Sequence, residues 1–298
     1  MPPGCTLSPD GLVRDLRHLP SAPRVLPRLK QLLSDGNSAM HEIVGLIRLD
    51  AGIAARVLQV ANSAYFSKGS RCLTVEEAVH RVGYDQVFEL VSFAVASQVL
   101  VRPLEVYGLD ADELWRMSVA GALAAEVLAE RLALERDVAY TVGLLHCVGM
   151  VAVDEWALRN ARSLRLSRGP FPVEASAEER TKLGFTQAEA GGALLRLWGF
   201  PVSIVEPVRW QYLPRGSVGH ARMATLLSTA KWLRNLVCHQ PAEAPAPAAL
   251  KLLGLEQEAL ETLATEVEQR LQEVDSILST GESAAVDRRA FPARAWNS

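Results

Sequence analysis

The sequence predicts an all-α fold. Apolar residues recur at spacings of three and four along most of the 298-residue chain, which is typical of one buried helix face. Residues that suit helix starts precede several of these runs. We find no convincing run of alternating polar and apolar residues and therefore expect few or no strands. The sequence also shows no repeat of fixed period.

The N-terminal part is predicted to contain short helices in succession. The segment APRVLPRLKQLLSDG forms the first helix, which Asp35 and Gly36 end. Ser38 and Asp50 are expected to cap the next two helices. The inward residues of these three helices are Leu26, Leu29, Leu32 and Leu33, then Ile43, Leu46 and Ile47, then Ile53, Val57, Leu58 and Ala61.

Residue pairs that lie three apart mark further helix starts. In a capping box, the side chain of each partner bonds the backbone N–H of the other. The helix that begins after the last such pair is expected to run to Gly199, and Pro201 starts the next one. The pairs are Thr74 with Glu77, Asp110 with Glu113, and Thr186 with Glu189.

Two breaks divide the chain, at residues 101–113 and at the Pro/Ala-rich stretch 240–250. After the second break, apolar residues recur as on one amphipathic helix, which packs either on the body of the protein or on a partner. We therefore expect a flexible N-terminus (1–11), a first helical subdomain (12–102), a second helical subdomain (103–240), a connector with the amphipathic helix (241–279) and a flexible tail (280–298).

Bulk composition excludes some classes of protein. The net charge of −3 gives no general attraction to nucleic acid, since nucleic-acid binders usually carry a basic excess. No apolar run is long enough to cross a membrane, and the first residues lack the features of a secretory signal. The four cysteines lie far apart without a C-x-x-C pair, which favours reduced thiols and a cytoplasmic location.

The stretch TVGLLHCVGMV places two reactive side chains, His146 and Cys147, in an apolar run. Adjacent residues on a helix point about 100° apart, so His146 is badly placed to activate Cys147 as a nucleophile. A zinc site with Cys238 and His239 would need unusual ligand spacing. A simpler alternative is a core histidine that is hydrogen-bonded to a carbonyl or side chain, next to an inert buried cysteine.

Four longer segments point to a family. They are LPSAPRVLPRLKQLLSDGNSAMHEIVGLIRLDAGIAARVLQVANSAYF, TVEEAVHRVGYDQVFELV, GLLHCVGMVAV and GFTQAEAGGALLRLWGFPVSIVEPVRWQY. The motifs ANSAYF, GLLH and LWGFP in this order form a specific combination. Together they resemble the HDOD domain, the HD-related output domain of bacterial signalling proteins, over nearly the whole chain.

This resemblance implies an all-α, HD-domain-like fold of two packed helical bundles. The first bundle would be the subdomain at 12–102, and the second, at 103–240, would be a degenerate relative of the HD phosphohydrolases. In HD enzymes, a His, a His-Asp pair and a later Asp bind a metal ion. That ion lowers the pKa of a bound water and so produces the nucleophile for phosphoester hydrolysis.

The resemblance places this metal site at positions that hold few ligands here. Only His146 keeps an imidazole, whereas Cys147 replaces the following Asp. Met117 is a poor ligand for such metals, and Lys231 would add positive charge beside a cation. We therefore expect no bound metal, no cofactor and no phosphohydrolase activity. The positions of this degenerate pocket are Met117, His146, Cys147, Gln187, Gln211 and Lys231.

Two groups of residues could form an interaction surface. The first lies in ANSAYF and either contacts a partner or only ends a helix and packs against its neighbours. The second recurs at intervals of three in RNARSLRLSRG, which on a helix gives a basic strip. That strip is either a solvated face or a docking site for an acidic partner or a phosphate-bearing ligand. The residues are Asn62, Ser63 and Tyr65, and Arg159, Arg162 and Arg165.

The sequence thus predicts a non-catalytic regulatory protein of signal transduction that acts through protein–protein interaction. The resemblance implies that its partners are other signalling proteins, in two-component or cyclic-dinucleotide pathways. One alternative is a sensor that binds a nucleotide or another anion in the degenerate pocket. A further alternative is a divergent metal-dependent phosphohydrolase.

Overall fold

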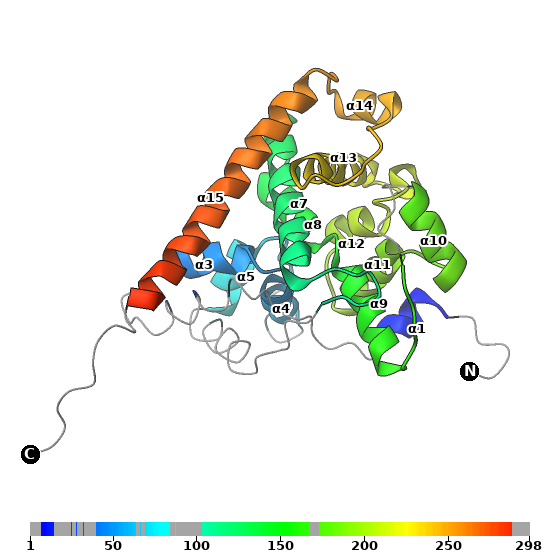
Figure 1. Cartoon of the computed structure of the whole chain (residues 1–298), viewed down its shortest axis with the longest axis horizontal. Helices are drawn as coiled ribbons and strands as arrows, with labels where there is room; N and C mark the ends of the chain where they lie inside the picture. The colour runs from blue at the N-terminus through cyan, green and yellow to red at the C-terminus, as the bar shows by residue number, and fades with distance from the viewer. Residues whose placement is uncertain are drawn as a thin grey trace, which may run out of the picture.

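Every regular element among the described residues is a helix, as predicted (Figure 1). Leu104 and Leu109 form the one β-bridge found there. Most of the predicted first helix and the Ser38 cap lie outside the described part of the chain. The computed structural model describes residues 7–14, 25, 28, 32, 40–63, 66, 69–83, 87, 103–166 and 173–287, the last with side chains at 176–275.

The helices form two bundles, and α7 and α8 lie at the centre, next to the first bundle. Helices α3, α4 and α5 pack on one another, and α9 to α13 surround the other side of α7 and α8 (Figure 1). The helices are α1 (Pro9–Val13), α3 (Met40–Arg48), α4 (Ala51–Ala61), α5 (Val75–Val82), α7 (Ala111–Arg131), α8 (Arg136–Leu145), α9 (Val148–Arg159), α10 (Val173–Leu183), α11 (Gln187–Leu197), α12 (Val202–Arg209), α13 (Ala221–Val237), α14 (Pro247–Leu253) and α15 (Ala259–Asp287), with a 3-10 turn η1 (Pro214–Gly216).

Side-chain caps start several helices at the predicted points. The carboxylate of Asp50 accepts the N–H of Ile53 at 2.9 Å and so begins α4. Complete capping boxes begin α7 and α11. The predicted box at Thr74 is half formed: its hydroxyl accepts the N–H of Glu77, but the Glu77 carboxylate accepts the N–H of Leu73.

Glycines allow the central helices to approach closely. A methyl group on Gly143 of α8 would lie 2.6 Å from the carbonyl oxygen of Gly121 on α7. The contact at Gly149, in the first turn of α9, is tighter, since a methyl group there would lie 1.8 Å from the carbonyl oxygen of Gln187. Because that neighbour is backbone, only glycine fits. The start of α9 is therefore held against the start of α11.

Hydrogen bonds and ion pairs join the first bundle to α7 and α8. The indole of Trp115 donates to the carbonyl of Leu49 at 2.9 Å, and the hydroxyl of Tyr140 donates to the carbonyl of Arg48 at 3.0 Å. The guanidinium of Arg48 lies 4.2 Å from the centre of the Tyr140 ring and pairs with Glu126 at 3.1 Å. These contacts satisfy the carbonyls at the end of α3, where the helix has no partners of its own.

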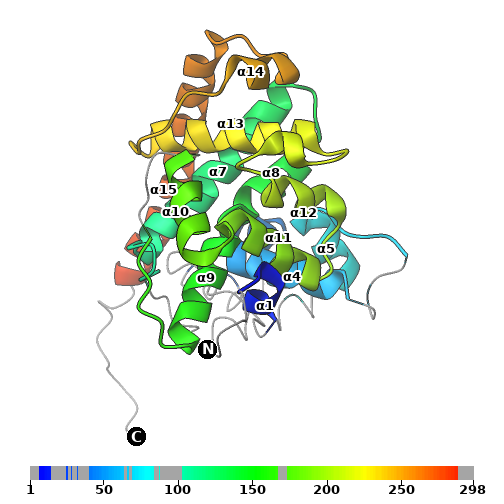
Figure 2. The same ribbon diagram turned by 90° about the vertical axis from the view of Figure 1, so that its right-hand side faces the viewer.

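The N-terminal helix α1 packs against α11 and α9 in the second bundle (Figure 2). Ser8 caps it by accepting the N–H of Gly11 at 3.1 Å, and Leu12 and Val13 are buried. The prediction of a flexible segment at 1–11 is therefore wrong for residues 9–11. The assignment of the chain from residue 12 to the first bundle is wrong for the end of α1.

The C-terminal helix α15 packs on α7 and α13, so of the two alternatives for the amphipathic helix, packing on the body is correct. It buries the predicted apolar face, including Leu263, Val267 and Leu271. Arg116 of α7 pairs with Asp275 of α15 at 3.0 Å. The helix runs to Asp287, beyond the predicted end at 279.

The stretch Arg136–Arg159 is long and apolar enough to cross a membrane by length and composition, although the sequence analysis found no such run. It comprises α8 and α9, and 94% of its tested window is buried within the fold. That burial is what the central helices of a protein core show, so its hydrophobicity is explained by packing against the other helices.

We expect Gly149→Ala to destabilise the protein by roughly 3 kcal/mol, because the added methyl group would overlap the backbone of α11. The matched control is Gly45→Ala in α3, where a methyl group would have no neighbour within 4 Å among the described residues. That change should stabilise the protein by about 0.5 kcal/mol through higher helix propensity. Urea unfolding followed by circular dichroism measures both. Equal stability of Gly149→Ala and the wild type would contradict the tight contact.

Candidate functional site

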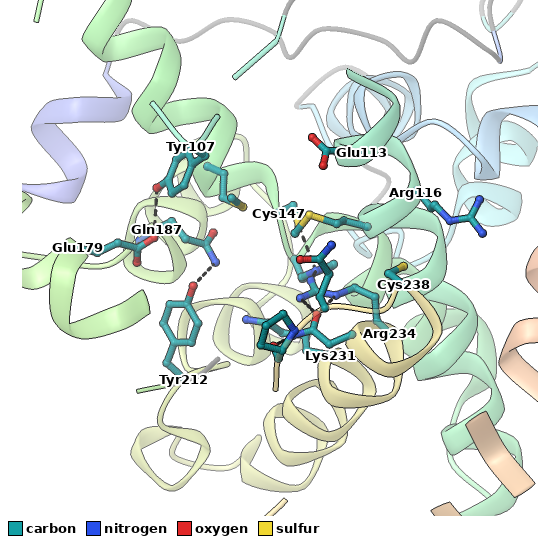
Figure 3. Close-up of a pocket in the computed structure, with 16 residues that line it drawn as sticks. Tyr107, Glu113, Arg116, Cys147, Glu179, Gln187, Tyr212, Lys231, Arg234 and Cys238 are labelled. Carbon is teal, nitrogen blue, oxygen red and sulfur yellow. Dashed lines mark hydrogen bonds between the residues drawn. The ribbon is translucent and has the colours of Figure 1, made fainter. Parts of the chain in front are cut away.

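A cavity of about 190 Å³ lies between α7, the α8–α9 junction, α11 and α13 (Figure 3). Its lining includes the exposed residues Gln240 and Pro241 as well as several buried side chains. Five of the six predicted pocket residues line it. Gln211 is not part of the lining, but its side chain donates to the carbonyl of His146 and accepts from Lys231. The five are Met117, His146, Cys147, Gln187 and Lys231.

His146 and Cys147 sit where the chain turns from α8 into α9. The imidazole Nδ1 lies 2.5 Å from the carbonyl oxygen of Gly143 and must donate to it, so Nε2 carries the acceptor lone pair. Nε2 lies 2.6 Å from Nη1 of Arg234 and 3.0 Å from Sγ of Cys147. The expectation that His146 cannot reach Cys147 is wrong, because the two residues do not continue one helix.

Both side chains are nevertheless held in their neutral forms. Burial, followed by the charges of Arg234 and Lys231, holds the pKa of His146 well below its usual range. Burial also raises the pKa of the Cys147 thiol, against the opposing effect of the same two cations. Because the thiolate is the reactive form, this Cys147 is not activated for nucleophilic attack.

Lys231 and Arg234 lie one turn apart on α13 and give the cavity a positive wall. Lys231 donates to Oε1 of Gln211 at 2.5 Å and lies 4.2 Å from the centre of the Tyr212 ring. Burial, and then the charge of Arg234, holds the pKa of Lys231 well below its usual range. Nε of Arg234 donates to Oδ1 of Asn235 at 2.8 Å. Both cations are thus supported by neutral acceptors.

The opposite wall carries the carboxyl group of Glu179 and the amide of Gln187 (Figure 3). Glu179 accepts the N–H of Gln187 at 2.8 Å and the hydroxyl of Tyr107 at 3.2 Å. Burial raises the pKa of Glu179 to about 7, although these two hydrogen bonds oppose the rise. The Gln187 amide nitrogen donates to the Tyr212 hydroxyl at 3.0 Å, whereas its Oε1 is buried without a partner among the described residues.

The donor set does not fit a hydrolytic metal. The one imidazole lone pair faces the guanidinium of Arg234, and the Cys147 thiol is protonated. Within the described residues, no group of three His, Cys, Asp or Glu side chains converges, which also removes the zinc site considered with Cys238 and His239. A divalent cation about 4 Å from a guanidinium would be opposed by roughly 8 kcal/mol at an effective dielectric constant of 20.

Sequence reasoning missed four residues that shape this cavity. Arg234 and Asn235 follow Lys231 by three and four positions on α13, and that helical spacing could have found them. Tyr107 comes from the loop before α7 and Glu179 from α10. No motif links these two segments, so only the fold brings them together.

Asn62 of the predicted ANSAYF surface is a structural residue. It is 4% exposed, accepts the N–H of Cys72 at 2.8 Å and donates to the carbonyl of the same residue at 3.0 Å. Its carbonyl and that of Gly199 each accept from Arg71 at 2.8 Å, which joins the two bundles. Ser63 is half-buried, and Tyr65 lies outside the described residues. The Asn62 side chain is therefore bonded within the fold.

The spacing predicts that the three arginines of the basic strip (Arg159, Arg162, Arg165) lie along one helix, and this prediction is wrong. Helix α9 ends at Arg159, because Asn160 caps it and Ala161 has a φ of 47°. All three side chains are exposed, and Arg159 pairs with Glu155 at 2.8 Å. Arg165 donates to the carbonyl of Glu105 in the loop before α7. The basic strip is therefore an irregular surface.

The fold and the cavity define a helical HD-like protein whose metal-binding position lacks a fitting donor set. Residues 19–214 match the HDOD domain, about two thirds of the chain. The protein belongs to the HDOD family.

Known proteins share this fold at low sequence identity. The crystal structure of the MmoQ response regulator of Methylococcus capsulatus str. Bath is 22% identical and covers 84% of this chain and 98% of its own, with a TM-score of 0.67. That of a virulence factor of Campylobacter jejuni subsp. jejuni is 19% identical and covers 89% and 96%, with a TM-score of 0.65. An uncharacterized protein of Treponema pallidum (strain Nichols) is 24% identical over 196 residues, which are 65% of this chain and 37% of that protein.

We expect the protein purified without chelators to contain well under one equivalent of manganese, iron or zinc. The reason is that Arg234 occupies the lone pair of His146. Elemental analysis of the wild type and of His146→Ala measures the metal content. One equivalent of metal in the wild type that is lost in His146→Ala would overturn this reading.

Glu179 should make the stability of the protein depend on pH. A carboxyl whose pKa rises from 4.5 to about 7 on folding stabilises the folded state fully below pH 4.5. That contribution, roughly 3 kcal/mol, is lost as the pH rises from 4.5 through 7. Glu179→Gln keeps an acceptor for the N–H of Gln187, can donate to the Tyr107 hydroxyl instead of accepting from it, and removes the titration. The difference in Tm between wild type and Glu179→Gln should therefore fall across this range, and a constant difference would contradict the raised pKa.

Proposed function

We propose that this HDOD protein is a non-catalytic component of signal transduction that works by binding other signalling proteins. One observation carries the non-catalytic part: Nη1 of Arg234 lies 2.6 Å from Nε2 of His146, the atom that would bind the metal. Hydrolysis by the HD mechanism needs a metal-activated water. A buried guanidinium at that atom replaces the metal by a fixed positive charge.

The kinds of proteins that share the fold support a signalling role. MmoQ is named a response regulator, and the Campylobacter jejuni protein is named a virulence factor. The match to MmoQ covers nearly all of that chain, so the likeness extends over both bundles. Signalling through such a module requires a surface for a partner rather than an active site.

We place that surface at Arg159 and Arg162, the end of α9 and the segment after it. Both side chains are exposed, and the cation of Arg162 is not used to hold the loop before α7, unlike that of Arg165. Exposed guanidinium groups bind carboxylates and phosphates with two parallel hydrogen bonds. The partner would therefore present an acidic or phosphorylated surface.

The test is capture of signalling proteins from a lysate of the native host by the tagged protein, with each captured partner then purified. Arg159→Glu combined with Arg162→Glu should weaken the binding of a purified partner at least tenfold, about 1.4 kcal/mol, because two attractive charges become repulsive. Lys251→Glu on α14 is the control, since Lys251 is exposed and α14 lies at the other end of the molecule in both views (Figures 1 and 2).

Unchanged binding of every purified partner by the double variant would show that this surface is not used. If no captured signalling protein binds again when it is purified, or none is captured at all, the docking function itself is contradicted. Loss of binding in Lys251→Glu as well would point to net charge rather than to the basic strip.

A further inference from the structure

The cavity beside α13 has donors that the protein itself does not use. Arg234 is 5% exposed and has five N–H groups. Nε and Nη2 donate to Oδ1 of Asn235 and Nη1 donates to Nε2 of His146, which leaves two N–H groups without an acceptor among the described residues. Among the described residues, no carboxylate forms an ion pair with the Arg234 guanidinium. A buried cation in this state is costly unless something else compensates it.

A second observation comes from the other wall. Oε1 of Gln187 is buried and has no hydrogen-bond partner among the described residues, although Gln187 is 2% exposed and lines the same cavity. An unsatisfied buried carbonyl costs free energy unless a donor reaches it. The cavity thus presents unused donors on α13 and an unused acceptor on α11, on opposite sides in Figure 3.

We propose that this cavity binds a small organic anion, with its phosphate or carboxylate group on Arg234 and Lys231 and a hydroxyl or amine group donating to Gln187. A guanidinium recognises both anionic groups through parallel hydrogen bonds, and an ammonium adds a point charge. The two cations stand one turn apart on α13 and can address the same group. The volume of about 190 Å³ admits a metabolite-sized molecule.

Two carboxyl groups face the same cavity and must be compatible with an anion. Glu179 has a pKa of about 7 because of its burial, so it is largely protonated below neutral pH. Glu113 lies at the edge, where it completes the capping box of α7 and is partly exposed to solvent. An anion on Arg234 would also favour the charged form of Lys231, so binding should be coupled to proton uptake. Binding should therefore weaken as the pH rises.

The probe is inorganic phosphate, compared with succinate and with sodium chloride at equal ionic strength. Phosphate or succinate should raise the Tm of the wild type by a few degrees more than chloride does. A response to phosphate alone assigns a phosphate ester, and a response to succinate alone assigns a carboxylate. Responses equal to that of chloride for both probes would overturn the proposal.

Two variants and a control assign the effect to the cavity. Arg234→Gln and Lys231→Met should each weaken the binding of the active probe at least tenfold in calorimetry. Lys231→Met keeps the proposal testable if Arg234→Gln fails to fold, because an apolar chain replaces a buried cation at little cost. Arg215→Gln removes an equal charge from an exposed position of η1 and should bind as the wild type does. Full binding by a folded Lys231→Met variant would contradict the site.

The acceptor on α11 is tested separately. Glycerol phosphate adds hydroxyl donors to the phosphate group and should bind the wild type more tightly than inorganic phosphate. Gln187→Met keeps the length of the side chain and should abolish that advantage, so that the variant binds glycerol phosphate and inorganic phosphate with equal affinity. If glycerol phosphate binds no better than phosphate, the assignment of Gln187 is wrong. These outcomes do not depend on whether the protein docks on partners, so the two proposals fail independently.

Discussion

The backbone contact between α9 and α11 is the constraint on which the cavity depends. Gly149 follows Cys147 by two residues, and the carbonyl that it meets belongs to Gln187, the first residue of α11. This approach therefore sets the distance between the His146–Cys147 turn and the wall formed by α11. A glycine in a helix costs about 1 kcal/mol relative to alanine, and here that cost permits a backbone approach that no other residue allows.

Helix α13 supplies the positive charge of the cavity, and this charge determines whether the site suits a metal ion or an anion. A buried cation is tolerated only with polar partners, and the protein provides neutral ones in Gln211, His146 and Asn235. The electrostatic polarity of the HD position is thereby reversed. Where an HD enzyme gathers negative and neutral ligands around a cation, this protein gathers neutral acceptors around its own cations and leaves room for negative charge.

Much of this arrangement could be predicted from the sequence, since helical periodicity and ordered motifs specify an all-α HDOD fold. Five of the pocket residues could be predicted because the resemblance to the HD metal site assigns each of their positions. Arg234 was missed because its role depends on how α13 is rotated toward the α8–α9 turn, which no local pattern records. The turn itself was missed because the apolar run through His146 and Cys147 contains no helix breaker at the break. Likewise, Ala161 follows the end of α9 with a φ of 47°, a conformation that alanine does not favour and that its residue type therefore does not predict.

The helices nearest the two ends of the described chain both rest on walls of the cavity. Helix α1 packs on α11, which carries Gln187, and α15 packs on α13 and α7, which carry Arg234 and Met117. The two bundles are therefore not separable pieces of chain, because an element from the beginning of the sequence completes the second bundle. A force applied at α1 or at α15 acts directly on a side of the cavity.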